Sequence, residues 1–108
     1  MNHLVNHQML EGFIDKVKNV FPNAAEAVVI ADRHGLPIAS RIEQPGWDEN
    51  LLACSAISDR KLLDLNDYQK VVRPLSNETQ LMVVLKKNTA NLHRFKIFNQ
   101  VLETDNPM

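Results

Sequence analysis

The sequence predicts an α/β domain of the α+β type, in which an antiparallel sheet of four or five strands is sandwiched between helices. Amphipathic spacing near both ends of the chain predicts a first and a last helix. Two pairs of apolar, β-branched segments joined by turn residues predict two hairpins, and a break with a helix start separates them. The expected order is helix, strand, strand, helix, an optional strand, strand, strand, helix.

The first helix is predicted over residues 4–21. Its apolar residues recur at intervals of three and four, which places them on one stripe of a helix. Pro22 ends it, because the residue before a proline is displaced from helical backbone angles. The stripe consists of Leu10, Phe13, Ile14, Val17 and Phe21.

A hairpin follows over residues 24–40. The β-branched run of residues 28–30 is typical of a strand covered on both faces. In the turn, Gly35 supplies a positive φ and the Asp32 side chain accepts backbone hydrogen bonds. Pro37 predicts that the second strand lies at an edge of the sheet.

A second helix begins after Asp48, the expected N-cap. Residues 51–58 carry no charge, and a helix without a polar face is buried on more than one side. We therefore expect one side to pack on the sheet and another to contact a second chain. The predicted self-association residues are Leu52, Ala53, Ala56 and Ile57.

The stretch from Lys61 to Leu65 has two interpretations, an extension of the second helix or a short third strand. Residues 68–75 and 80–86 predict the second hairpin. A last helix opens at Asn88 or Asn91. Its apolar residues at helical spacing are Leu92, Phe95, Phe98, Val101 and Leu102.

Length and charge limit the classes of function. The chain of 108 residues suits one domain, assigned to residues 1–105 with a frayed tail at 106–108. With 12 basic and 13 acidic residues, it is not built to coat nucleic acid or an anionic membrane. A single cysteine and the lack of a long apolar run or signal-peptide pattern predict a cytoplasmic protein without membrane insertion.

No residue pattern predicts catalysis, a metal or a cofactor. His3 and His7 share a helical face, but a zinc site needs three or four ligands, so they are interpreted as solvated side chains. Cys54 has small neighbours and no evident base, which favours a buried, inert thiol over a nucleophile. The three glycines, at 12, 35 and 46, form no phosphate-binding motif. We expect no enzymatic activity.

Two residues are candidates for contact with a partner. Trp47 precedes the N-cap of the second helix, where it either packs against Leu51 or Leu52 or anchors a partner. Arg33 lies at the tip of the first hairpin, where it is either a solvated turn residue or a contact for an acidic surface.

Residues 27–40, AVVIADRHGLPIAS, resemble the first hairpin of the roadblock (dynein light chain) family. Residues 72–75 and 81–87 are similar to that family's last two strands, which lead into its closing helix. The resemblance implies a homodimer with paired second helices and joined sheet edges. It also implies partners such as a small Ras-like GTPase or a larger signalling or transport assembly. The family has a long second helix and three following strands, whereas the interval between Asp48 and Leu81 is tight for both.

Two functions are therefore expected. The first is a non-catalytic, dimeric interaction or scaffold domain that resembles regulators of small Ras-like GTPases. The alternative is a small-molecule sensor with a pocket between sheet and helix. The large side chains of Phe13, Phe95 and Phe98 would fill such a pocket, which favours the first.

Overall fold

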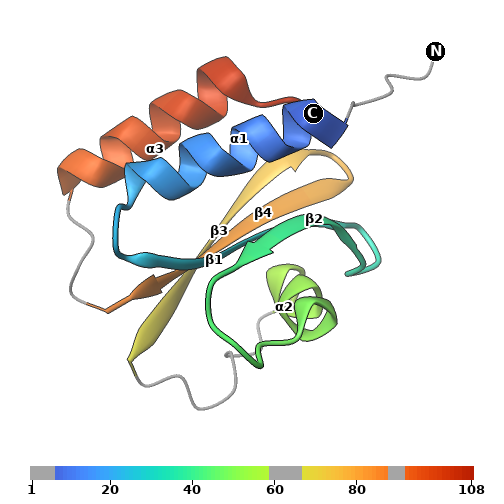
Figure 1. Ribbon diagram of the computed structural model, residues 1–108. Coiled ribbons are helices and arrows are strands. Elements are labelled where there is room, and N and C mark those ends of the chain that lie inside the picture. The colour runs from blue at the N-terminus through green and yellow to red at the C-terminus, as the bar shows by residue number, and fades with distance from the viewer. Residues whose placement is uncertain (1–6, 59–66, 88–91) are drawn as a thin grey trace.

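A four-stranded antiparallel sheet, in the order β2-β1-β4-β3, separates α1 and α3 on one face from α2 on the other (Figure 1). This computed structural model describes residues 7–58, 67–87 and 92–108, and it confirms the predicted fold class. The possible strand at Lys61 to Leu65 lies outside the described residues. The elements are α1 (His7–Val20), β1 (Ala25–Asp32), β2 (Pro37–Ile42), α2 (Glu49–Ala56), β3 (Tyr68–Ser76), β4 (Thr79–Lys86) and α3 (Leu92–Asp105).

The two central strands explain the apolar runs in the sequence. β1 and β4 pair along almost their whole length, with Val28 opposite Val83 and Ile30 opposite Leu81. Helices cover both faces of this pair, so neither strand needs a polar side. The strands that contain prolines, β2 with Pro37 and β3 with Pro74, lie at the two edges.

A first core fills the space between the sheet and the pair α1 and α3. Phe21, which directly follows α1, forms edge-to-face contacts with two aromatic rings of α3, 5.6 Å from Phe95 and 5.4 Å from Phe98 between ring centroids. Phe13 is also buried there, whereas Leu92 at the start of α3 is 81% exposed. The aromatic side chains therefore fill the space between sheet and helix that a ligand pocket would need.

A second, smaller core lies between α2 and the opposite face of the sheet. The strands contribute Ala27, Val29 and Ala31 from β1 and Met82 and Val84 from β4. The helix contributes Leu52, Ala53 and Ala56, and small residues on both sides let it approach the sheet closely. Each face of the sheet thus has its own core, and β1 and β4 belong to both.

The chain ends beside the first core. The Asn106 amide donates a hydrogen bond of 2.8 Å to the carbonyl oxygen of Leu75, which joins the C-terminal residues to β3. Lys16 of α1 bonds the Asp105 carboxylate at 3.0 Å, and this hydrogen bond lowers the pKa of Asp105. Among the described residues, no helix has the length and apolar character needed to span a bilayer.

Candidate protein-interaction surface

The turn between β1 and β2 is closed by the side chain of Asp32. Its Oδ1 accepts hydrogen bonds from the backbone N–H groups of His34 at 2.8 Å and Leu36 at 3.0 Å. The bond from Leu36 is the main reason that the pKa of Asp32 lies below its usual value. Gly35 has a φ of 80°, as predicted, because a residue without Cβ adopts this conformation at little cost.

Gly35 also allows this turn to pack against the end of α2. A Cβ at this position would lie 3.0 Å from Cδ1 of Ile57 and 3.3 Å from Cα of Cys54. The hydroxyl of Ser40, on β2, donates to the Glu49 carboxylate at the start of the helix. The first hairpin is therefore joined to α2 at both ends of the helix.

α2 has only eight residues, and polar contacts hold both of its ends. Asp48 is the N-cap, as predicted, and its carboxylate accepts from the Asn50 N–H at 2.7 Å. At the C-terminus, Nζ of Lys70 on β3 donates to the carbonyl oxygens of Ser55 at 2.7 Å and Ser58 at 2.9 Å. The sequence did not predict this role of Lys70, because it depends on where β3 lies relative to the helix.

The structure changes which residues of α2 can meet another chain. Leu52, Ala53 and Ala56 are buried against the sheet of the same chain, so these three predicted interface residues are inaccessible. Ile57 is 43% exposed and keeps its predicted position on an accessible side. Within the helix, Leu51 also points outward, with 56% of its surface exposed.

Cys54 is exposed, which contradicts the prediction of a buried thiol. The small neighbours of Cys54 suggested packing, and two of them, Ala53 and Ser55, are indeed buried. On a helix, adjacent positions point about 100° apart, so small residues on either side do not bury the residue between them.

The accessible apolar residues gather on α2 and on the hairpin beside it. Seven large hydrophobic residues are exposed in the described part of the chain, and four belong to this region. We call these four, Leu36, Ile38, Leu51 and Ile57, the α2 patch. An accumulation of this kind is typical of a surface that another molecule covers.

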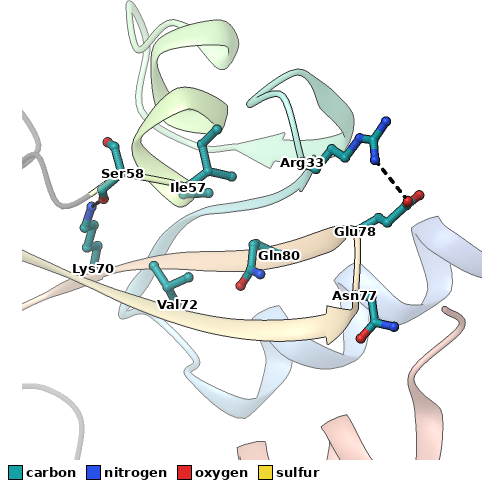
Figure 2. Close-up of a pocket in the computed structure, with 9 residues that line it drawn as sticks. Arg33, Ile57, Ser58, Lys70, Val72, Asn77, Glu78 and Gln80 are labelled. Carbon is teal, nitrogen blue, oxygen red and sulfur yellow. Dashed lines mark hydrogen bonds and ion pairs between the residues drawn. The ribbon is translucent and has the colours of Figure 1, made fainter.

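An open groove of about 520 Å³ lies next to the α2 patch, between the end of α2 and the hairpin of β3 and β4 (Figure 2). Ile57 and Val72 provide apolar walls, and Lys70 lies at one end. At the other end, Arg33 pairs with Glu78 at 3.4 Å. This exposed ion pair joins the tips of the two hairpins and is screened by solvent.

The two candidate contact residues differ in their surroundings. Trp47 is half-buried, packs against the second core and forms an edge-to-face contact with Tyr68, with 5.1 Å between ring centroids. This packing favours its interpretation as an intramolecular contact. Arg33 is exposed at the hairpin tip, as expected, and its pairing with Glu78 favours the interpretation as a solvated turn residue.

One buried carboxylate was missed by the sequence prediction. Glu26 of β1 is 92% buried, and it accepts a hydrogen bond of 2.9 Å from the Gln44 amide. Lys86 of β4 lies 3.2 Å from its other oxygen. A glutamate between alanines in an apolar strand gives no local sign of these partners, which come from other segments.

Within the described ranges, no group of three or more His, Cys, Asp or Glu side chains is arranged to hold a metal ion. His3 lies outside those ranges, so the structure does not describe the pair formed by His3 and His7. No protein-family model matches this sequence, and no curated protein matches it.

Proposed function

We propose that this protein is a non-catalytic interaction domain that forms a homodimer through the α2 patch. The observation that carries the proposal is the concentration of exposed apolar side chains on α2 and the adjacent hairpin. Covering them removes apolar surface from water at a gain of roughly 25 cal/mol per Å². Asn50 and Cys54, also on the exposed side of α2, are small enough for a second helix to approach.

The helix alone is too small for a stable dimer. Eight residues of α-helix are about 12 Å long, whereas a standard interface covers about 800 Å² on each partner. The hairpin residues Leu36 and Ile38 extend the apolar area beside the helix. The dimer is therefore proposed to include both α2 and the first hairpin of each chain.

We further propose that the dimer serves as a platform for a small Ras-like GTPase or a larger assembly. This part rests on the resemblance of residues 27–40 to the first hairpin of roadblock domains, and it is an analogy of sequence and fold. Co-precipitation with purified Ras-like GTPases, each loaded with GDP or a non-hydrolysable GTP analogue, tests it. Binding to none of them would leave self-association as the supported activity.

The dimer is tested by changing one exposed residue of the α2 patch. Leu51→Asp places a charge in the proposed interface but leaves the second core intact, because the side chain points outward. We expect wild-type protein to have a mass near twice 12.3 kDa by light scattering, and the variant to have a mass near 12.3 kDa.

Leu92→Asp is the matched control, since Leu92 is exposed on α3, on the opposite face of the sheet. This variant should remain a dimer. A wild-type monomer at all concentrations, or a Leu51→Asp variant that still dimerises, would refute the proposed interface.

The alternative function as a small-molecule sensor has less support. It predicts a roomy cavity between sheet and helix, and the corresponding space beside α1 and α3 contains the packed rings of Phe13, Phe21 and Phe98. A thermal-shift screen with a panel of metabolites distinguishes it from the interaction domain.

A further inference from the structure

A polar pocket lies at the end of the sheet where α1 joins β1 (Figure 1). Its volume of about 400 Å³ falls within the range of small-molecule pockets. β1 begins at this end, and β2 and β4 finish there, whereas the two hairpin turns lie at the opposite end. The pocket shares no lining residue with the groove beside α2 and contains no residue of the α2 patch.

The buried carboxylate of Glu26 belongs to the lining of this pocket. Ala25 of β1 lies opposite Leu85, and Ala27 lies opposite Val84, so Glu26 is an extra, bulged residue of the strand. A bulge turns a side chain away from the regular alternation between the two faces of a sheet. This accounts for a glutamate in an apolar strand that lines a polar pocket instead of a core.

Partners inside the chain hold this carboxylate in place. The Gln44 amide donates to one oxygen at 2.9 Å, and Nζ of Lys86 lies 3.2 Å from the other. Separating a buried ion from its partner is strongly unfavourable. The pair of Glu26 and Lys86 therefore stays closed and forms a fixed part of the pocket.

A second ion pair at the pocket is more exposed. Nζ of Lys18, near the end of α1, lies 2.9 Å from the carboxylate of Glu43, which directly follows β2. The two side chains are 34% and 44% exposed, so solvent screens their attraction and opening the pair costs little free energy. This pair can exchange partners, whereas the buried pair cannot.

The charges of the pocket indicate the class of ligand. Its four ions, two ammonium groups and two carboxylates, have no net charge. A ligand with a single charge would pair with one member of the exposed pair and leave the other without a partner. A ligand that carries both charges offers a carboxylate to Lys18 and an ammonium group to Glu43. Charge matching therefore favours a zwitterion.

The remaining lining suits an α-amino acid. The side-chain amides of Asn19 and Asn23 are exposed at the pocket and can donate hydrogen bonds to a carboxylate. Asn23 has a φ of 63°, a left-handed conformation that asparagine adopts more readily than most residues, in the turn between α1 and β1. Pro22 and Ala25 add apolar surface for an aliphatic side chain.

We infer that this pocket binds a free α-amino acid with an aliphatic side chain. The ligand opens the pair of Lys18 and Glu43, its carboxylate bonds Lys18, and its ammonium group bonds Glu43. The buried pair of Glu26 and Lys86 remains closed beside it. This inference does not depend on the proposed dimer, since no residue of the α2 patch lines the pocket.

The probe is L-leucine, titrated into isotopically labelled full-length protein and followed by nuclear magnetic resonance. We expect saturable shifts of the side-chain amide signals of Asn19 and Asn23. L-leucinamide lacks the carboxylate, and N-acetyl-L-leucine lacks the ammonium group, but both keep the side chain. Each should bind about tenfold more weakly or worse, because one ion of the opened pair then loses its partner.

A variant of the protein provides the complementary test. Glu43→Gln removes the acceptor for the ammonium group at an exposed position, so circular dichroism should show an unchanged fold. Glu103→Gln makes the same change at an exposed position of α3, outside the pocket, and is the matched control. We expect L-leucine to bind Glu43→Gln about tenfold more weakly, or worse, and Glu103→Gln as tightly as wild type.

Three results would overturn the inference. The first is the absence of saturable shifts with L-leucine at millimolar concentration. The second is equal affinity for L-leucine and either of its singly charged analogues, and the third is unchanged binding in Glu43→Gln. Loss of the dimer in Leu51→Asp with unchanged binding of L-leucine would support a site that is separate from the α2 patch.

Discussion

The turn formed by Asp32 and Gly35 shows how single residues position the α2 patch. The Asp32 carboxylate holds the backbone of His34 and Leu36, and the absence of a side chain at Gly35 lets the turn contact Cys54 and Ile57. Asp32 and Gly35 are the residue types that such a turn requires. By shaping the turn, they also bring it into contact with the end of α2.

Replacement of Gly35 by alanine tests this contact. The variant combines a φ of 80° with a Cβ only 3.0 Å from Ile57, so we expect a loss of about 1–2 kcal/mol in the free energy of unfolding. Gly12→Ala is the control, because Gly12 lies inside α1 with open space around it and alanine is the better helix former. It should gain about 1 kcal/mol. Urea denaturation measures both free energies of unfolding. A change in the same direction for the two variants would contradict the proposed role of Gly35.

The carboxylate of Asp32 predicts a dependence of stability on pH. Its pKa is lowered in the folded state, so its contribution is complete above the ordinary value of 3.8 and is lost as the pH falls through the lowered value. Asp32→Asn removes this charge. The difference in urea midpoint between wild type and variant should be largest near neutral pH and shrink below pH 3.8. If the difference in urea midpoint instead grew as the pH fell, the predicted contribution of Asp32 would be wrong.

At the scale of elements, α2 is a short helix that depends on residues outside it. A helix of eight residues is marginal by itself, because nucleation is costly and few internal hydrogen bonds form. Asp48 satisfies N–H groups at its start, and Lys70 satisfies carbonyl groups at its end. The positive charge of Lys70 also suits the negative end of the helix dipole.

Lys70→Met keeps the aliphatic part of the side chain and removes the donor. We expect a loss of about 1–3 kcal/mol in the free energy of unfolding, because carbonyl groups of Ser55 and Ser58 lose a charged partner. Lys96→Met, at an exposed position of α3, should change stability by less than about 0.5 kcal/mol. Faster hydrogen exchange of the α2 amides in Lys70→Met, with unchanged exchange in α1, would show that the loss of stability is confined to α2.

At the scale of the whole molecule, the two cores share β1 and β4, whereas the proposed contacts lie on one side. α1 and α3 cover one face of the sheet, and the α2 patch and the groove lie on the other. In the proposed dimer, the face covered by α1 and α3 stays within the chain, and the α2 face is the one that meets a second copy.

The proposed self-association predicts a stability that depends on protein concentration. Dimerisation stabilises the folded state by mass action, so the melting temperature of wild-type protein should rise with protein concentration. In Leu51→Asp the melting temperature should not change with concentration, and in Leu92→Asp it should behave as in wild type. Scanning calorimetry over a hundredfold range of concentration makes this comparison.

Much of the fold followed from local patterns. The spacing of Phe13, Ile14 and Val17, the β-branched run at residues 28–30 and the turn at Asp32 and Gly35 predicted elements that the structure contains. The same patterns failed for α2. Residues 51–58, which form most of α2 and its C-terminal cap, carry no charge, so they contain no signal for which side faces the sheet.

The sequence by itself determined the order of the elements, their turns and the edge position of β2, because helical period, alternation and proline chemistry act over a few residues. Only the tertiary structure decided that Leu52, Ala53 and Ala56 turn inward while Leu51 and Ile57 face out. It also decided that Lys70 caps α2 and that a groove lies between the end of α2 and the hairpin of β3 and β4. These features depend on contacts between distant segments, which no local pattern encodes.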